Sequence, residues 1–243
     1  MTLSLFTVAS LPPEDTFRLD GPEGHHAATV QRLRVGEALL LGDGAGGLAR
    51  CEVVAVSRGA LDLVVRERSR EPEPCPRVTV VQAIAKGDRG ELAVQAMTEV
   101  GVDTVVPWSA ARSVARWKAD RGAKALERWR AVAREAAKQS RRAWFPAVAE
   151  LASTAAVADL VGAATAAYVL HEEATAPLAG IDLPADGEIV LVVGPEGGIA
   201  PEELAAFVSA GARPVRLGSS VLRTSTAGVA ALSVVNARTG RWG

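Results

Sequence analysis

The stretch IVLVVGPEGGIAPEELAAFVSA, residues 189–210, contains the pattern that decides the fold. Its first part, 189–193, is apolar without a polar break, which is typical of a strand in a parallel sheet covered on both faces. Three glycines and a proline follow at 194–198, and the segment 201–210 predicts a helix. Because glycines let a backbone turn sharply and approach a ligand, this strand, loop and helix predict an α/β unit with a ligand at the loop.

A second loop of small residues follows another predicted strand, at 214–217. The sequence RLGSSVLRTSTA, residues 216–227, combines glycine and hydroxyl side chains with Arg223. Thr224, Ser225 or Thr226 can cap the helix predicted at 226–238. An arginine beside such a cap can hold a phosphate, a carboxylate or an electron-rich base edge, so Arg223 is a candidate ligand contact. Neither loop is a P-loop or a GxGxxG fingerprint.

Predicted strands and helices alternate through the C-terminal part of the chain. This alternation indicates an α/β sandwich with a mainly parallel sheet, in which ligands collect at the carboxyl ends of the strands. The predicted strands are 78–83, 103–106, 147–151, 166–170, 189–193 and 214–217, and the predicted helices are 88–100, 120–140, 201–210, 226–238 and one that starts at Ser153 or Thr154.

The N-terminal part has a different pattern, with short apolar or alternating runs, a glycine-rich turn at 42–47 and one helical stretch at 22–33. This pattern predicts a small β-barrel. Prolines at alternate positions, 72, 74 and 76, then stiffen the chain and end strand pairing. We therefore expect a barrel domain at 1–70, a linker at 71–77 and an α/β domain at 78–243.

The composition restricts the class of protein. Hydrophobic residues make up 49% and charged residues 23% of the 243 residues, which excludes a disordered chain. No apolar run is long enough to span a membrane, and residues 1–6 lack the features of a signal peptide. Cys51 and Cys75 form no CxxC pair, so we expect a cytoplasmic protein without a metal site.

Positive charge is concentrated in one segment, although the whole chain carries a net charge of −1. Between Arg112 and Arg142 there are eleven basic and three acidic residues, which give this segment a charge of +8. Four of the five tryptophans, at 108, 117, 129 and 144, lie in or beside it. A basic helix face can simply be solvated, but basic and aromatic side chains together favour a nucleic acid as the partner.

Five blocks of the sequence together resemble one known family. They are HHAATVQRLRVGEALLLGDG (25–44), QAIAKGDRGELAVQAMTEVGVDTVVPWSAARSV (82–114), REAAKQSRRAWFPAV (134–148), LVVGPEGGIAPEE (191–203) and RLGSSVLRTSTA (216–227). The last two resemble the C-terminal signatures of the SPOUT class of RNA methyltransferases, and the full set resembles the RsmE-type enzymes that methylate N3 of a uridine in 16S ribosomal RNA. One departure is Ser225, where that family usually has glutamate.

The resemblance implies a fold, a cofactor and a cofactor site. The expected fold is an N-terminal PUA-like β-barrel followed by a SPOUT-type α/β domain with a trefoil knot, in a homodimer. S-adenosylmethionine is expected in the knot as the methyl donor, and no metal is implied. The residues expected to contact it are Leu170, Gly194, Pro195, Gly198, Leu217, Gly218, Val221, Leu222, Arg223 and Thr224.

The chemistry of uridine N3 suggests the catalytic residues. N3 carries a proton and is a poor nucleophile until that proton leaves, and the negative charge then spreads to the neighbouring carbonyls. Arg223 is our candidate for stabilising this charge. Glu196 is a candidate proton acceptor or orienting group, although a carboxylate in such a loop can equally have a structural role, and Glu172 beside His171 is a weaker alternative.

The resemblance also implies an RNA substrate, either 16S ribosomal RNA or the assembled small subunit. Phosphate contacts are expected to set the affinity and to make it fall with salt. The residues expected to contact RNA are Arg112, Gln139, Arg141 and Arg142, with His26, Arg32 and Arg34 of the barrel extending the footprint.

Three other functions are compatible with parts of the pattern. The first is a SPOUT enzyme that methylates a ribose 2′-hydroxyl, against which the N-terminal barrel and the order of the blocks argue. The second is a non-catalytic RNA-binding or assembly protein, suggested by Ser225 but opposed by the intact GPEGG and LRT sequences. The third is a metabolic enzyme with a nucleotide cofactor, which the absence of a P-loop and of GxGxxG makes the least favoured.

Overall fold

The computed structural model describes residues 3–242, which fall into two compact units. The first unit contains the described residues up to Glu73 together with Ala137–Phe145, and the second contains Pro74–Ala136 and the described residues from Pro146 onward. The chain thus leaves the first unit inside the proline-rich segment 71–77. It later returns to that unit for nine residues, Ala137–Phe145.

The first unit is built on a five-stranded sheet with the order β1-β3-β4-β5-β2. The pair β1–β3 is parallel and the other pairs are antiparallel. Phe6, Leu39, Leu41 and Leu61 are fully buried on its inner face. The strands are β1 (Leu5–Thr7), β2 (Thr16–Leu19), β3 (Ala38–Gly42), β4 (Gly47–Ser57) and β5 (Ala60–Arg70).

Two elements of this unit differ from the sequence-based prediction. The helix expected at 22–33 is instead a short helix α1 (Gly21–His25) continued by the π-helical turn η1 (His26–Val30). Strand β2 is absent from the prediction, because it is only four residues long and its alternation of exposed and less exposed residues is too short to stand out in the sequence.

The segment Ala137–Phe145 is tied to the glycine-rich turn of the first unit by backbone hydrogen bonds. The amide of Gly46 donates to the carbonyl of Ala143 at 2.9 Å, and the amide of Phe145 donates to the carbonyl of Gly44 at 2.9 Å. Lys138 adds an ion pair with Glu23 of α1 at 2.7 Å, in which the lysine side chain is only 8% exposed. The segment is therefore a structural part of the first unit.

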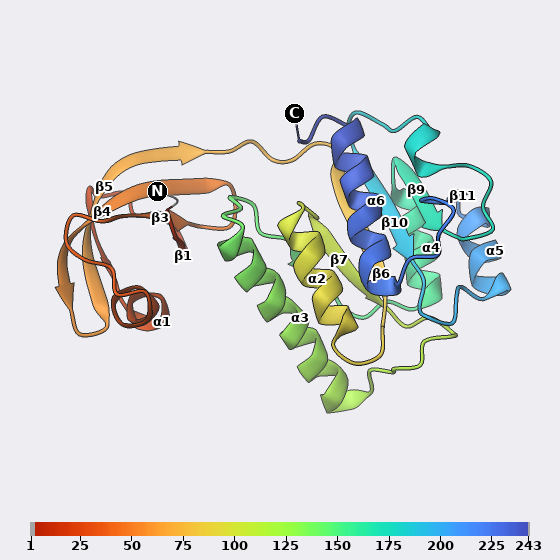
Figure 1. Ribbon diagram of the computed structural model, residues 1–243, viewed down its shortest axis with the longest axis horizontal. Helices are drawn as coiled ribbons and strands as arrows, with labels where there is room; N and C mark the ends of the chain where they lie inside the picture. The colour runs from red at the N-terminus through yellow and green to blue at the C-terminus, as the bar shows by residue number, and fades with distance from the viewer. Residues whose placement is uncertain (1–2, 243) are drawn as a thin grey trace. The chain divides into compact units, whose positions relative to one another are not determined.

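The second unit is a parallel sheet between two layers of helices (Figure 1). Its strand order is β11-β9-β10-β6-β7-β8, with β6 and β10 adjacent at the centre. The strands are β6 (Arg77–Ala83), β7 (Thr104–Trp108), β8 (Ala147–Val148), β9 (Ala166–Leu170), β10 (Glu188–Val193) and β11 (Arg213–Val215); the helices are α2 (Arg89–Glu99), α3 (Ala119–Gln139, whose end belongs to the first unit), α4 (Thr154–Ala163), η2 (Leu178–Gly180), α5 (Pro201–Ser209) and α6 (Thr224–Arg238).

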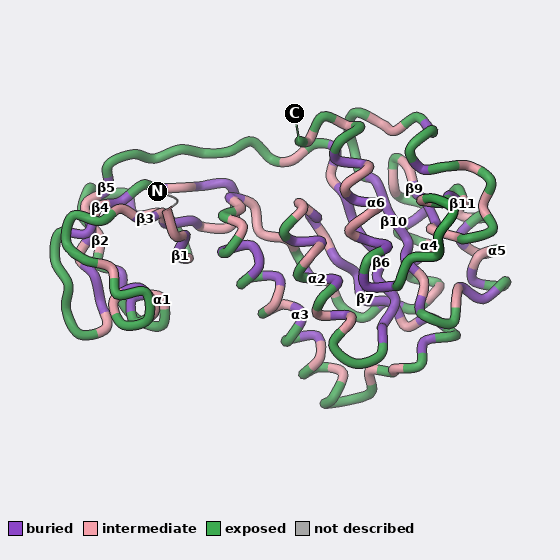
Figure 2. The backbone as a smooth tube through the Cα atoms, viewed as in Figure 1, coloured by how far each residue is buried: buried purple, intermediate pink, exposed green. Residues whose placement is uncertain are grey.

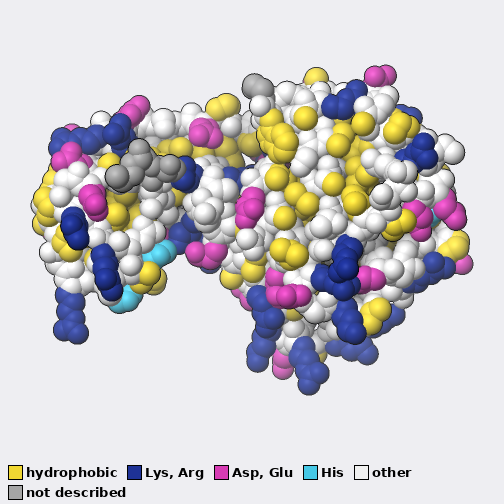
Figure 3. Space-filling view, viewed as in Figure 1, with side chains coloured by type: hydrophobic (Ala, Val, Ile, Leu, Met, Phe, Trp, Pro, Cys, Tyr) yellow, Lys and Arg dark blue, Asp and Glu magenta, His cyan; other side chains and the backbone are white. Residues whose placement is uncertain are grey.

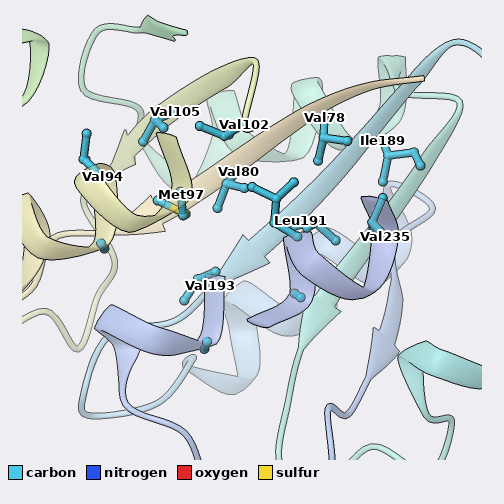
Figure 4. Close-up of a cluster of buried hydrophobic side chains, with 14 of the residues drawn as sticks. Val78, Val80, Val94, Met97, Val102, Val105, Ile189, Leu191, Val193 and Val235 are labelled. Carbon is cyan, nitrogen blue, oxygen red and sulfur yellow. The ribbon is translucent and has the colours of Figure 1, made fainter. Parts of the chain in front are cut away.

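Each face of this sheet has its own hydrophobic core. Val78, Val80 and Leu191 contribute to the core under α2 and α6 (Figure 4), whereas Val190 and Val192 contribute to the core under α4 and α5. Figure 2 shows the central strands as buried along nearly their whole length. Burial on both faces explains why these strands are uninterrupted apolar runs in the sequence.

Several expected helix caps are absent. Asp88 precedes α2 but its side chain makes no capping hydrogen bond. Helix α6 begins at Thr224, two residues earlier than expected, so the N-cap is Arg223 and no side chain caps the helix. The expectation that Thr224, Ser225 or Thr226 would cap α6 is therefore wrong, because these residues lie within its first turn. Ser153 does cap α4, by accepting from the amide of Ala156.

Two of the four tryptophans near the positive segment are core residues. Trp108 is fully buried and Trp129 is 3% exposed. Trp117 packs edge-on against Trp129, with ring centroids 5.0 Å apart. These contacts give the rings a structural role in the second unit.

No helix in the described part of the chain combines the length and the hydrophobicity of a membrane span.

A buried ion pair fixes the end of the chain to the sheet. Arg241 and Asp103 lie 2.7 Å apart, with side chains 7% and 4% exposed. The guanidinium also donates to the carbonyls of Pro76 and Gly101, and Asp103 accepts from the amide of Val78. Both terminal nitrogens of the guanidinium therefore have acceptors, and such additional hydrogen bonds are what allows a buried ion pair to be tolerated.

We expect Asp103→Asn to lower the free energy of unfolding of the second unit by about 3–5 kcal/mol, because it leaves a buried guanidinium without its counter-charge. Urea unfolding followed by tryptophan fluorescence measures this change. Glu150→Gln is the matched control, since Glu150 pairs with Arg130 but is 80% exposed, and it should change little. Equal effects of the two substitutions would contradict the structural role given to Asp103.

Candidate cofactor-binding site

A cavity of about 390 Å³ opens at the carboxyl ends of β9, β10 and β11, within the second unit. Its size lies within the range of small-molecule sites, roughly 300–1,000 Å³. It contains all ten residues predicted to bind the cofactor, and Glu196. The lining residues are Arg89, Leu170, His171, Glu172, Val193–Glu196, Gly198, Ile199, Val215–Thr224 and Ala227.

The first wall is the loop that follows β10. A Cβ atom on Gly194 would lie 2.7 Å from Cγ1 of Ile199, so the loop can fold back on itself only with glycine at this position. Gly198 has a φ of +74°, a conformation that favours glycine. A side chain at either position would clash or strain the backbone. The two glycines therefore allow the backbone of this loop to lie along the cavity.

Glu196 fastens this loop to the start of α2. Its Oε1 accepts from the amide of Lys86 at 3.1 Å and lies 3.4 Å from Nη1 of Arg89. Partial burial raises the pKa of Glu196, but hydrogen bonds from its own amide and that of Lys86, together with Arg89, outweigh this effect and hold the pKa below its ordinary value. Glu196 is therefore ionised at neutral pH and is a weak base.

The second wall is the loop between β11 and α6. Val221 is 80% exposed and Leu222 is 40% exposed, so apolar side chains of this loop are open to a ligand. A Cβ atom on Gly218 would meet no other atom within 4 Å. The side chain of Arg223 is exposed and lines the cavity, and its backbone carbonyl accepts from the amide of Thr226.

One hydroxyl joins the two walls. Thr224 is 5% exposed, and its Oγ1 donates to the carbonyl of Gly194 at 2.8 Å. The same Oγ1 accepts from Nε2 of Gln82, at the end of β6, at 3.0 Å. Ser225, where the resembling family has glutamate, is 5% exposed in the first turn of α6.

The residues predicted to contact RNA lie outside the cavity. Arg112 is exposed and belongs to the second unit, where its Nη1 donates to the carbonyl of Gly197 at 3.4 Å. The remaining predicted contacts belong to the first unit. Within it, His26 is half-buried and packs edge-on against Phe6, with centroids 5.8 Å apart, which gives that ring a structural contact. The other first-unit residues are Arg32, Arg34, Gln139, Arg141 and Arg142.

Sequence reasoning missed several residues at or next to the site, among them Arg89 and Gln82. Arg89 lines the cavity beside Glu196, but it lies a hundred residues away in sequence and no local pattern connects the two. Gln82 could have been found from the sequence, because it is a polar residue in the apolar run VTVVQAIA of a buried strand.

Among the described residues, no group of three or more histidine, cysteine or acidic side chains is arranged to hold a metal ion.

Family models match both parts of the chain. Residues 71–236 match the RNA methyltransferase domain family, and residues 19–66 match the RNA methyltransferase PUA domain family. The fold and the cavity thus belong to the class of RNA methyltransferases.

Individual relatives identify the family within this class. The ribosomal RNA small subunit methyltransferase E of Mycobacterium tuberculosis is 51% identical, over 100% of this chain and 94% of that protein. The protein of the same name from Bacillus subtilis is 31% identical, over 92% of this chain and 91% of that protein. The chain belongs to the ribosomal RNA small subunit methyltransferase E family.

A solved structure indicates the methyl donor. The ribosomal RNA small subunit methyltransferase E of Neisseria gonorrhoeae, bound to S-adenosylmethionine, is 25% identical and matches with a TM-score of 0.84, over 97% of this chain and 98% of that chain. This chain is accordingly an enzyme that methylates ribosomal RNA with S-adenosylmethionine as the donor. The cavity fits such a molecule, because it presents backbone groups, apolar side chains and both signs of charge.

We expect Thr224→Val to weaken binding of S-adenosylmethionine up to about tenfold, because it removes the hydroxyl that joins the two walls, and such a hydrogen bond is worth about 0.5–1.5 kcal/mol. Isothermal titration calorimetry measures the affinity. Thr239→Val is the control, since the Thr239 hydroxyl donates to Val235 at the far end of α6. The prediction fails if both variants bind like the wild type.

We expect Glu196→Gln to weaken S-adenosylmethionine binding at pH 7 and to bind like the wild type at low pH. The folded-state pKa of Glu196 is depressed, so its stabilising effect is present above its ordinary pKa of 4.5 and is lost as the pH falls through the lower folded-state value. Titrations of both proteins from pH 8 down to the lowest pH at which they stay folded test this, because the folded-state pKa of Glu196 lies below 4.5 and the acid end must pass through it. A defect that persists unchanged at the acid end would show that the charge of Glu196 is not what holds the loop.

Proposed function

We propose that this enzyme transfers the methyl group of S-adenosylmethionine to N3 of a specific uridine in 16S ribosomal RNA. The observation that supports this most strongly is the full-length similarity to ribosomal RNA small subunit methyltransferase E proteins, together with a cavity that contains all the predicted cofactor-binding residues. The uridine N3 position follows from the sequence resemblance described above.

We propose that the cofactor occupies the cavity between the two loops. Gly194, Pro195 and Gly198 would hold it from one side, and Leu217, Gly218, Val221 and Leu222 from the other, with Leu170 at the end of β9. S-adenosylmethionine supplies an electrophilic methyl group there. The protein residues supply orientation and exclude water from the reacting atoms.

Arg223 is the proposed catalytic residue. Its exposed side chain lines the cavity, where a guanidinium would stabilise the negative charge on the uridine carbonyls when N3 loses its proton. Glu196 is better suited to an orienting role than to that of proton acceptor, because its lowered pKa makes it a poor base. It would hold the GPEGG loop and Arg89 in place.

We propose that basic side chains of both units contact the RNA backbone. In the second unit these include Arg112 and the beginning of α3, over which lysines and arginines gather in Figure 3. In the first unit, Arg141 is exposed next to Lys138, whose own charge is paired with Glu23. The other proposed contacts are His26, Arg32, Arg34, Gln139 and Arg142.

The remaining architectural proposals follow from the resemblance. They are a closed PUA-like barrel at 1–70, a linker at 71–77, and a knotted methyltransferase domain at 78–243. A homodimer is supported by the hydrophobic side chains that gather over α2 and α6 in Figure 3. Leu92 of α2 is 53% exposed, which also supports it. We place the enzyme in the cytoplasm because its proposed substrate, the small ribosomal subunit, is there.

The test is methylation of small ribosomal subunits that lack their native base methylations, with labelled S-adenosylmethionine. The RNA is then digested and the labelled nucleoside is identified by mass and retention time. We expect 3-methyluridine. Label on a ribose 2′-oxygen would overturn the N3 assignment, and binding of the cofactor without any transfer would favour a non-catalytic protein.

We expect Arg223→Ala to lower kcat about 100-fold or more in this assay, which is the usual effect of removing one group that stabilises developing charge. Arg213→Ala is the control, because Arg213 is also exposed but does not line the cavity. A variant that loses only S-adenosylmethionine affinity, with an unchanged kcat, would reassign Arg223 from catalysis to cofactor binding.

A further inference from the structure

Gln82 is a fully buried polar residue in the centre of the methyltransferase unit. It lies near the end of β6 and pairs in register with Val193 of β10, the residue just before Gly194. It does not line the cavity, and the proposed function gives it no role. Its neighbours on the strand, Val81 and Ala83, are apolar and fully buried, so an apolar residue would fit the pattern of the strand better.

The surroundings of Gln82 fix the orientation of its amide group. Nε2 lies 3.2 Å from the carbonyl oxygen of Ala83, 3.4 Å from that of Thr224, and 3.0 Å from Oγ1 of Thr224. Backbone carbonyls only accept hydrogen bonds, so the nitrogen must face them. This orientation leaves Oε1 buried with no hydrogen-bond partner in the described part of the chain.

The orientation of the amide in turn fixes the hydroxyl proton of Thr224. Because Nε2 of Gln82 donates to Oγ1, the single proton of that hydroxyl is free to point to the carbonyl of Gly194, 2.8 Å away. The result is a chain of two hydrogen bonds that runs from β6 through the first turn of α6 to the loop after β10. Thr224 and Gly194 both line the cavity.

Close packing of α6 on the sheet makes this chain possible. A Cβ atom on Gly228 would lie 2.7 Å from the sulfur of Met97 and 3.4 Å from Oε1 of Gln82. Helix α6 can therefore approach β6 closely enough for the amide to reach Thr224. The buried Oε1 without a partner opposes folding, so the amide offers its hydrogen bond to Thr224 at a cost in stability that an apolar residue would avoid.

We propose that Gln82 is a positioning residue for the cofactor cavity, which it shapes by directing the Thr224 hydroxyl to the Gly194 carbonyl. The proposal rests on the assignment of this cavity to S-adenosylmethionine. It predicts that Gln82 acts through Thr224 and has little effect on the chemical step once the cofactor is bound.

The test is a double-mutant cycle on the full-length protein, with Gln82→Met, Thr224→Val and the double variant. Calorimetric affinities for S-adenosylmethionine and steady-state kinetics with small ribosomal subunits are measured together with thermal unfolding. We expect Gln82→Met to raise the Kd and the KM for S-adenosylmethionine up to about tenfold, with kcat nearly unchanged and a Tm no lower than that of the wild type. In the Thr224→Val background, Gln82→Met should change the affinity no further.

Gln82→Glu is a second variant, measured at a pH above the pKa of the introduced carboxyl, which burial raises, because only the ionised carboxylate cannot donate to Thr224. It would instead accept the hydroxyl proton and draw it away from Gly194, so cofactor binding should be weaker than in Gln82→Met. Gln95→Met on the exposed face of α2, where Gln95 pairs with Glu99, is the control and should bind normally. If Gln82→Glu does not fold, the cycle with methionine still decides the question.

The outcomes separate this proposal from the assignment of the cavity. If Thr224→Val weakens binding and Gln82→Met does not, the role of Gln82 is wrong and the cavity assignment stands. Independent, additive losses would also overturn the relay through Thr224. If neither the Thr224 nor the Gln82 variants affect binding while the protein remains folded, the hydrogen-bond chain from Gln82 to Gly194 does not shape the cofactor cavity and the proposal is wrong.

Discussion

The β6–β10 pair at the centre of the parallel sheet must bury both of its faces, and the rest of the second unit follows from this constraint. Alternate residues enter two separate cores, so the strands accept almost only apolar side chains. Six or seven residues are enough to cross the core, and functional groups must then be placed where the strands end. The cavity lies at this boundary, where β10 turns into a loop whose backbone is exposed.

The loops of the site are held in place by backbone geometry and a few hydrogen bonds more than by clusters of charged side chains. Glu196 ties the loop after β10 to α2, and Thr224 ties the same loop to α6. Each contact joins segments far apart in sequence, so the cavity is shaped before any ligand arrives. Such preorganisation lowers the cost of binding, because the loops lose less conformational freedom when the cofactor enters.

The sequence was informative where structure depends on local chemistry. Burial on both faces leaves an apolar run such as 189–193, and a tight loop favours glycine at Gly194 and Gly198, so both loops could be predicted. The residues that the resemblance implies for the cofactor all line the cavity. The sequence was uninformative where contacts between residues far apart in the chain determine the structure. Helix α6 starts two residues earlier than expected, at Thr224, whose hydroxyl donates to the carbonyl of Gly194, and the four-residue edge strand β2 pairs with β5. The sequence does not show which distant residues make these two contacts.

Because the segment Ala137–Phe145 belongs to the first unit, it affects the order in which the two units fold during synthesis. The glycine-rich turn of that unit has its hydrogen-bond partners in Ala143 and Phe145, about a hundred residues later. During synthesis, the N-terminal unit therefore cannot complete its contacts until strands β6 and β7 of the methyltransferase sheet have also left the ribosome. The two units mature in an interleaved order, in contrast to the usual sequence in which an N-terminal domain folds first and alone.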